Sequence, residues 1–325
     1  MAKLAGVSQA AVSLVLGSGN TASLSEETIT RINEAARELG YVPNHLAQAL
    51  KTRRTMTIGC VVPDITNPFY PSLFRGVQRV ANTHGYDVIA VNTDGTPENE
   101  QRFLNWALQG RVDGVVGVFF TLRTRELAVL IRGEIPVVRI EATRKPGGEL
   151  PVDDIYVDSR AAAAEVIDLL LSRGHERIAM IAGAGGPQAV RSDGYREAML
   201  RAGYDPVIIA TRHFSEEAGA RAATEILDAQ RGVSAIFAAN DLLAIGALQT
   251  LRTRGISVPR QMAVVGFDNI SAAPLVTPAL TTVTQFQDRM GEVAAEILLR
   301  RIDGALTGAA TVTEMPFELI EREST

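Results

Sequence analysis

The sequence has few of the residues that usually mark disulfide scaffolds, metal sites or membrane spans. Cys60 is the single cysteine, so no disulfide can form within the chain; it lies in an apolar stretch, where a buried thiol is expected. The four histidines are scattered without metal-ligand spacing, so we predict no metal site. No apolar run approaches the ~20 residues of a membrane span, and we expect no membrane partner.

The chain also lacks an overall excess of positive charge. Its net charge is −5, which argues against a nucleic-acid partner if the chain is taken as a whole. Residues 1–54, however, carry a net charge of +2, and the remainder carries −7. Because Lys51, Arg53 and Arg54 close this segment, phosphate contacts are expected near its end.

The opening residues have the pattern of two short helices joined by a tight turn. Ala2, Gly6 and Val12 stand where a helix-turn-helix needs a small residue at the helix crossing, a glycine in the turn and a buried aliphatic residue. Ser8 is a good N-cap for a second helix that continues through Leu16.

A third helix is expected between a cap at Ser25 and Gly40, with Glu26 and Glu27 in its first turn. Three such helices form a small core that can present the second helix to the major groove of DNA. The residues expected to contact DNA from this helix are Ser8, Gln9, Ala10, Ser13 and Leu14.

From residue 57 onward, apolar β-branched stretches alternate with amphipathic helical stretches. Strands are expected at 58–62, 87–91, 114–118, 137–140, 178–182, 207–209, 235–237, 263–265 and 312–319. Helices are expected at 70–84, 98–108, 161–172, 194–202, 216–230 and 242–254. This alternation predicts an α/β fold with parallel sheets covered by helices on both faces, and about ten strands suggest two sheets.

Motifs spread along the whole chain resemble the LacI/GalR family of bacterial transcriptional regulators. They are Gly6-Val7-Ser8, the hinge pattern of Pro43, Asn44, Ala47 and Leu50, and the stretches Val62–Tyr70, Arg111–Gly114, Ala239–Asp241 and Val265–Asp268. The resemblance implies a helix-turn-helix headpiece at 1–42, a hinge helix and linker at 43–56, and a periplasmic-binding-protein-like body at 57–325. Within the body it implies a first subdomain at 57–156 and 286–311 and a second at 157–285 and 312–325, joined by three crossovers.

The resemblance also implies how the hinge meets DNA. In the family, the hinge helix folds on the operator and its leucine wedges between base pairs in the minor groove, where the kinked duplex allows further contacts. The residues that match these hinge contacts are Asn44, Ala47, Leu50 and Lys51. The implied partner is double-stranded, pseudo-palindromic operator DNA bound by a homodimer, because one reading helix covers one half-site.

The chain departs from the family pattern in three places. It begins where the family has further residues of the first helix, so we expect the true start to lie upstream. Leu14 stands where the family often has an arginine that reads guanine, so the operator is expected to differ from the commonest half-site. At the crossover, Asp158-Ser159-Arg160-Ala161-Ala162 replaces the usual Asp-Asn-x-x-Gly, so the effector class cannot be copied from a relative.

The effector is expected in the cleft between the two sheets, because ligands of open parallel sheets bind beyond the carboxyl ends of the strands. Candidate residues that follow strands are Asp64, Phe69, Asn92, Phe119, Arg139 and Asp158 in the first half, and Arg191, Phe214, Asn240, Asp241 and Asp268 in the second. The resemblance implies that Phe69, Arg191, Asp241 and Asp268 touch the effector. Carboxylates and an arginine can bind hydroxyls while aromatic faces cover C–H surface, which fits a sugar or polyol.

Two other functions remain open at this point. Residues 1–19 have a lysine followed by a mildly apolar stretch, as a signal peptide does, which is compatible with a periplasmic sugar-binding protein of the same body fold. The stretch Gly183–Gln188 resembles the start of a dinucleotide fingerprint, as in an oxidoreductase, but lacks its third glycine.

Polar Ser8, Gln9 and Ser13 interrupt the apolar stretch of the signal-peptide alternative, and the dinucleotide fingerprint is incomplete. We predict a cytoplasmic transcriptional repressor that is not an enzyme, needs no cofactor and responds to a small-molecule effector.

Overall fold

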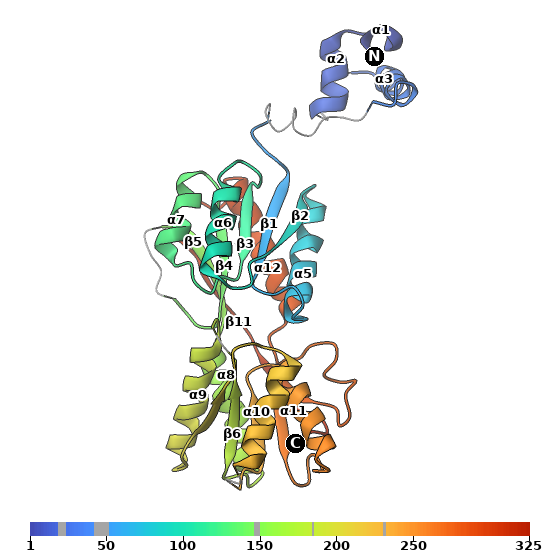
Figure 1. Cartoon of the computed structure of the whole chain (residues 1–325). Helices are drawn as coiled ribbons and strands as arrows, with labels where there is room; N and C mark the ends of the chain where they lie inside the picture. Colours follow the sequence, from blue (N-terminus) through green and yellow to red (C-terminus); the bar gives the residue numbers. More distant parts are fainter. Residues whose placement is uncertain (19–23, 42–51, 146–149, 184, 230–231) are drawn as a thin grey trace. The chain divides into compact units, whose positions relative to one another are not determined.

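The computed structural model of the chain describes residues 1–18, 24–41, 52–145, 150–183, 185–229 and 232–325 (Figure 1). These residues form two compact units, Met1–Met56 and Thr57–Thr325. The hinge candidates Asn44, Ala47, Leu50 and Lys51 lie outside the described residues.

The first unit contains the three predicted helices. Its elements are α1 (Ala2–Ala5), α2 (Gln9–Ser13), a π-helical turn η1 (Leu14–Ser18) that continues α2, and α3 (Glu26–Glu38). Gly6 has φ 64°, as the tight turn between α1 and α2 requires. The Oγ atom of Ser8 accepts a hydrogen bond of 3.1 Å from the Ala11 amide, and Ser25 caps α3 in the same way.

The core of this unit differs in detail from the expectation. Ala5, Ala11, Ile32 and Ala35 are buried, whereas Val12 is only partly buried. We expected Ala2 at the helix crossing, but the chain reverses at Gly6, so the end of α1 rather than its start enters the core.

The second unit is an α/β structure with two six-stranded sheets, each covered by helices on both faces (Figure 1). The first sheet has the order β11-β5-β4-β3-β1-β2 and is parallel throughout. Its strands are β1 (Thr57–Val62), β2 (Asp87–Asn92), β3 (Gly114–Gly117), β4 (Val137–Glu141), β5 (Val152–Val157) and β11 (Val312–Met315). The helices around it are α5 (Phe69–Thr83), α6 (Pro97–Ala107), α7 (Thr124–Arg132) and α12 (Gln287–Ile302).

The second sheet has the order β12-β10-β9-β8-β6-β7, and only β12 runs antiparallel to its neighbour. Its strands are β6 (Ile178–Ala182), β7 (Val207–Ala210), β8 (Ala235–Ala238), β9 (Ala263–Asp268), β10 (Thr281–Thr284) and β12 (Glu318–Ile320). The helices around it are α8 (Ser159–Ser172), α9 (Gln188–Arg201), α10 (Glu216–Asp228) and α11 (Asp241–Thr253). We call the two layered bodies around these sheets the first lobe and the second lobe.

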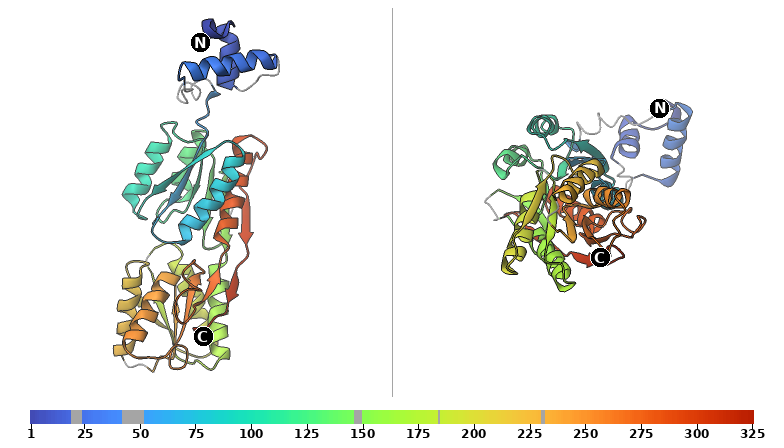
Figure 2. Two further views of the ribbon diagram at one scale, coloured as in Figure 1. Left: turned by 90° about the vertical axis from the view of Figure 1, so that its right-hand side faces the viewer. Right: turned by 60° about the horizontal axis from the view of Figure 1, so that its bottom comes forward.

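The chain passes between the lobes after β5, after β10 and between β11 and β12. The family resemblance implied that residues 312–325 belong to the second lobe, and the sequence predicted a single strand at 312–319. That placement is wrong for β11, which pairs in parallel with β5 in the first sheet. Pro316 separates β11 from β12, because proline cannot donate a ladder hydrogen bond, and the two strands lie at the edges of different sheets (Figure 2).

Close helix packing holds the first lobe together around the crossover helix. A Cβ atom at Gly76 of α5 would overlap the Asp288 carbonyl oxygen, and one at Gly291 of α12 would overlap the Leu73 carbonyl oxygen. Because both helices need glycine at this contact, α12 is fixed directly against α5. Within the described part of the chain, no helix is long and apolar enough to cross a membrane.

Candidate functional site

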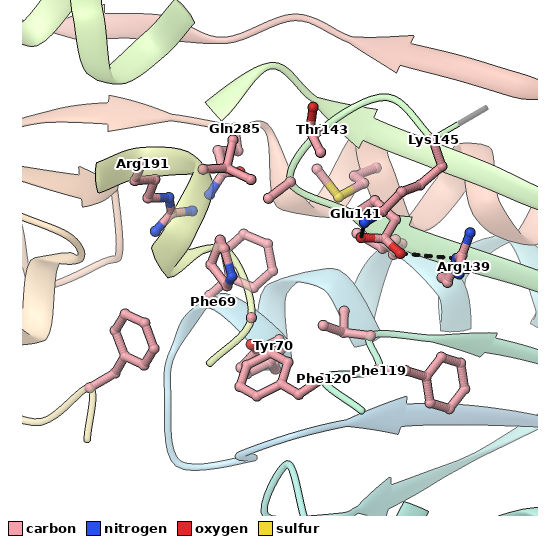
Figure 3. Close-up of a pocket in the computed structure, with 18 of the residues that line it drawn as sticks. Phe69, Tyr70, Phe119, Phe120, Arg139, Glu141, Thr143, Lys145, Arg191 and Gln285 are labelled. Atoms are coloured by element: carbon pink, nitrogen blue, oxygen red, sulfur yellow. Dashed lines mark ion pairs between the residues drawn. The ribbon is translucent and has the colours of Figure 1, made fainter. Parts of the chain in front are cut away.

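One large cavity lies between the carboxyl-terminal ends of the two sheets. Its volume is about 740 Å³, and residues from both lobes line it. Figure 3 shows Arg191 and Gln285 on one side, Arg139, Glu141 and Lys145 on the other, and Phe69, Tyr70 and Phe120 between them. The position agrees with the rule that ligands bind beyond the carboxyl ends of parallel strands.

The second-lobe wall of the cavity is built around Arg191, which lies in the first turn of α9. Its guanidinium is buried, donates a hydrogen bond of 2.6 Å from Nη1 to the Ala239 carbonyl, and approaches the Asp268 Oδ1 atom at 3.5 Å from Nη2. The guanidinium also stacks on the Phe267 ring, 3.7 Å from its centroid. These contacts fix the plane of the side chain before any ligand arrives.

Two hydrogen-bonding atoms of this wall have no partner among the described residues. They are Nε of Arg191 and Nδ2 of Asn240, whose residues are 4% and 1% exposed. The Oδ1 atom of Asn240 is already used, because it accepts a hydrogen bond from the Leu243 amide and caps α11. Both atoms are themselves buried, so they are unsatisfied donors within the wall rather than groups exposed to the cavity.

Asp268 supplies the acceptor of the same wall. Its Oδ1 accepts a hydrogen bond of 2.7 Å from Gln285 Nε2, and its carbonyl oxygen accepts one from Gln287. Its φ of 110° is unusual for a residue with a side chain and is held by these contacts. Burial raises the pKa of the Asp268 carboxyl to about 6, although the Arg191 charge and the Gln285 hydrogen bond oppose the rise.

The first-lobe wall contains a chain of alternating charges. Arg139 donates two hydrogen bonds to the buried Asp154 carboxylate, at 2.8 and 3.0 Å, and its Nε lies 3.0 Å from Glu141 Oε1. Lys145 Nζ lies 3.7 Å from the other Glu141 oxygen. Burial raises the pKa of Glu141, while the Arg139 and Lys145 charges lower it.

Aromatic rings separate the two polar walls. Aromatic residues make up 5% of the chain, yet five of them line this one cavity. They are Phe69, Tyr70, Phe119, Phe120 and Phe214. Such a belt can cover the C–H faces of a ring-shaped ligand while the walls bind its polar groups.

The structure brings together most, but not all, of the effector candidates that the sequence suggested. The candidates that line the cavity are Phe69, Phe119, Arg139, Arg191, Phe214, Asn240 and Asp268. Arg191 was expected in a loop before a helix at 194, but α9 begins at Gln188 and includes it. The Arg139 guanidinium lines the cavity but is already bound to Asp154 and Glu141.

Four candidates lie outside the lining of the cavity, and each has a local structural role. Asp64 accepts hydrogen bonds within its own turn from Thr66, and Asn92 accepts one from the Ile65 amide. Asp158 caps α8 by accepting from the Ala161 amide at 3.0 Å. Asp241 accepts from the Thr282 hydroxyl and the Ile270 amide; burial, followed by the Asp268 charge, raises its pKa to about 8.

The sequence analysis missed Tyr70, Phe120, Glu141, Lys145 and Gln285 among the lining residues. Glu141 is the last residue of β4, and Gln285 directly follows β10. The same strand-end rule therefore finds both residues once the ends of these strands are known. Lys145 follows four residues later on the loop, and nothing in the local sequence sets it apart.

The exposed side of α2 is the second candidate site. Gln9, Ala10 and Ser13 are exposed on this helix, Ser8 is exposed at its cap, and Leu14 is half-buried at the start of η1. Gln9 and Ser13 lie one turn apart, so they project from the same face of the helix. Such a face is compatible with reading base edges in a major groove.

Comparisons with known proteins match both units. A family described as "Bacterial regulatory proteins, lacI family" matches residues 1–44, and one described as "Periplasmic binding protein-like domain" matches residues 167–325. The HTH-type transcriptional regulator RegA of Clostridium saccharobutylicum is 34% identical over 333 residues, which cover 100% of this chain and 98% of RegA. The ribose operon repressor of Escherichia coli strain K12 is 34% identical over 308 residues, 93% of this chain and 92% of the repressor.

A solved structure extends this likeness to three dimensions. The complex of the transcriptional regulator CelR with cellobiose has a TM-score of 0.75 at 30% identity, over 100% of this chain and 98% of that chain. The match over residues 1–44 also favours a regulator over a periplasmic protein, because residues 1–19 then belong to the headpiece rather than to a signal peptide. Like the relatives matched along its length, this chain belongs to the LacI family of bacterial DNA-binding transcriptional regulators.

Proposed function

We propose that this regulator is a cytoplasmic repressor whose affinity for operator DNA is set by a carbohydrate bound in the cavity between the lobes. The observation that carries the proposal is the second-lobe wall of the cavity, which is lined by the polar side chains of Arg191, Asn240, Asp268 and Gln285. This set of donors and an acceptor matches vicinal hydroxyl groups, each of which both donates and accepts.

The aromatic belt and the comparisons support the same class of ligand. Phe69 and Phe214 line the cavity from different lobes, and aromatic side chains can pack against the C–H surface of a sugar ring. Two of the similar proteins are described by a sugar: the ribose operon repressor and the CelR complex with cellobiose.

We further propose that the regulator acts as a homodimer on a two-fold symmetric operator. One α2 helix covers one half-site, so two copies are needed for a full operator. The body has apolar side chains that a second copy could cover: Ile89, on the edge strand β2, is 43% exposed, and Leu275 is 80% exposed.

Operator binding tests the proposal directly. We expect Leu50→Ala to lower operator affinity by about tenfold or more, because the family resemblance assigns this residue to the minor-groove wedge and each 1.4 kcal/mol is a factor of ten. The measurement is a gel shift with duplexes from the DNA upstream of the gene, read out as affinity and as two chains per duplex. Leu39→Ala, at an exposed leucine after α3, is the matched control with unchanged affinity. Equal operator affinity of Leu50→Ala and the native protein would refute the wedge.

Carbohydrate binding is also expected to depend on pH through Asp268. Because its pKa in the folded protein is raised to about 6, the carboxylate loses its acceptor character as the pH falls through this value. Affinity is expected to be about tenfold weaker at pH 5 than at pH 7.5, since a proton then competes with the ligand. Because the pKa of Asp268 is higher in the folded than in the unfolded protein, its contribution to the free energy of unfolding decreases as the pH rises from about 4 to 6. Protonation of Asp268 at pH 5 therefore does not destabilise the fold.

Isothermal titration calorimetry at both pH values checks this, using the carbohydrate that gives the largest thermal shift in a screen of sugars and polyols. Asp268→Asn serves as the comparison, because an amide does not titrate; its residual binding is expected to lose the pH step. A native protein with the same affinity at both pH values would show that Asp268 does not bind the ligand as a carboxylate.

A further inference from the structure

The cavity has two polar walls, and we infer that its effector is an uncharged carbohydrate of two linked rings, one bound at each wall. This inference rests on the proposed function and specifies the ligand of the same site. The first ring lies against Arg191, Asn240 and Asp268 in the second lobe, and the second ring lies against Glu141 and Lys145 in the first lobe.

The first-lobe wall is suited to bind hydroxyl groups. Each carboxylate oxygen of Glu141 keeps free acceptor capacity after its contact with Arg139 or Lys145, and the Lys145 ammonium keeps free donors. Arg139 is held in place by its two hydrogen bonds to Asp154, and its contact with Glu141 in turn fixes the position of the Glu141 carboxylate. Figure 3 shows the Glu141 and Lys145 side chains together on the side opposite Arg191, with Thr143 between Lys145 and Gln285.

Phe120 keeps the two walls apart. Its ring reaches from the first lobe to the second, where a Cβ atom on Gly186 would overlap it and one on Gly185 would lie 3.2 Å away. The backbone under the ring is fixed, because the buried Glu100 carboxylate accepts hydrogen bonds from the Phe120, Thr121 and Leu122 amides at 2.7, 3.0 and 2.8 Å. Further approach of the lobes at this point therefore requires Phe120 to move.

The volume of the cavity indicates the size of the ligand that it can hold. Its volume of about 740 Å³ corresponds to about 25 water molecules at ~30 Å³ each. A single sugar ring in contact with the Arg191 wall would leave much of this space to water and the Glu141 wall without a ligand partner. Two linked rings can contact both walls and pack against the aromatic belt between them.

The charges of the cavity favour a neutral ligand. Arg191 is paired with Asp268, Arg139 with Asp154, and Lys145 with Glu141. Arg123 is the one lining cation whose guanidinium has no carboxylate partner among the described residues, and this residue is exposed to solvent. Because these paired charges of the site are already balanced, an ionised sugar would lose its hydration without gaining a free counter-charge inside.

The first test compares ligand size and charge on the full-length protein by isothermal titration calorimetry. The probes are neutral disaccharides with different linkages, starting with cellobiose, each paired with its component monosaccharides and with the corresponding 6-phosphate or uronate. At least one neutral disaccharide is expected to bind ten times more tightly than its monosaccharides and than its charged form. A monosaccharide or a charged sugar as the tightest ligand would overturn the inference.

The second test assigns the second ring to the first-lobe wall. Glu141→Gln removes the charge but keeps the shape, and we expect it to weaken the disaccharide about tenfold while weakening the monosaccharide much less. Glu217→Gln, at an exposed position on α10, is the matched control for removal of a carboxylate. If Glu141→Gln weakens both ligands equally or neither, the two-ring arrangement is wrong.

These outcomes separate the inference from the proposed function. Tight monosaccharide binding that changes operator affinity would overturn the two-ring ligand and leave the carbohydrate-controlled repressor intact. If no sugar in the panel binds, both are overturned, while operator binding by the family's headpiece is unaffected.

Discussion

Replacing Arg191 with alanine is expected to abolish the response of the protein to its effector. The substitution removes the unpartnered Nε donor and leaves the Asp268 carboxylate buried without its guanidinium partner. A hydrogen bond between a charged group and a ligand contributes about 1.5–3 kcal/mol, and the same guanidinium pairs with Asp268 in the wall of the cavity. We therefore expect carbohydrate affinity to fall by about 100-fold or more, as measured by isothermal titration calorimetry.

Arg196→Ala provides a matched control on the same helix. Its guanidinium is exposed on α9, does not line the cavity and pairs with Asp193 on the surface, so carbohydrate affinity should not change. Operator binding without carbohydrate reports folding of both variants. An Arg191→Ala protein that binds carbohydrate within threefold of the native affinity would place the ligand elsewhere.

Replacing Glu100 with alanine is expected to produce the largest loss of stability. This carboxylate is fully buried in α6 and accepts hydrogen bonds from three consecutive amides and the Thr121 hydroxyl. Removing it leaves the buried Leu122 amide and the part-buried Phe120 and Thr121 donors without their acceptor, and an unsatisfied buried donor costs about 1–3 kcal/mol. Summed over these donors, we expect the free energy of unfolding to fall by about 3–5 kcal/mol.

Glu98→Ala is the control from the same first turn of α6, where the carboxylate is exposed and interacts mainly with the helix dipole. Its cost is expected to be about 0.3–1 kcal/mol. Chemical denaturation followed by circular dichroism measures both variants. Because Glu100 also fixes the backbone of Phe120, its loss should weaken carbohydrate binding in the protein that remains folded. Equal stability of the two variants would show that the 120–122 turn does not depend on Glu100.

The architecture of the body could be predicted because its strands are short apolar runs between amphipathic helices. All eight strands expected before residue 270 are present in the structure. Strands β5 and β10 were missed, and they contain Asp153, Asp154 and several threonines rather than a continuous apolar run. Their polar side chains are satisfied by partners distant in the sequence, such as Arg301 for Asp153 and Asp241 for Thr282.

The functional site was predicted only in part, because half of it depends on how the lobes face each other. Arg191 and Asp268 follow strands of one sheet, so the strand-end rule was sufficient to find them. Phe120 and Lys145 lie on loops of the first lobe, and their importance follows from contacts with Gly186 and Glu141 that no local pattern encodes. Asp64 and Asp158 satisfied the same rule, but Asp64 stabilises a turn and Asp158 caps α8, since short carboxylates serve both purposes.

The measurement that tests the central claim most directly is operator affinity as a function of carbohydrate. Fluorescence anisotropy of the full-length protein, at fixed salt, compares a duplex from its own upstream region with a scrambled duplex, each with and without the carbohydrates of the panel. The specific duplex should bind about 10³-fold or more tightly than the scrambled one, and one carbohydrate should change this affinity by about fivefold or more. Equal affinity for both duplexes under every condition would contradict a carbohydrate-controlled repressor.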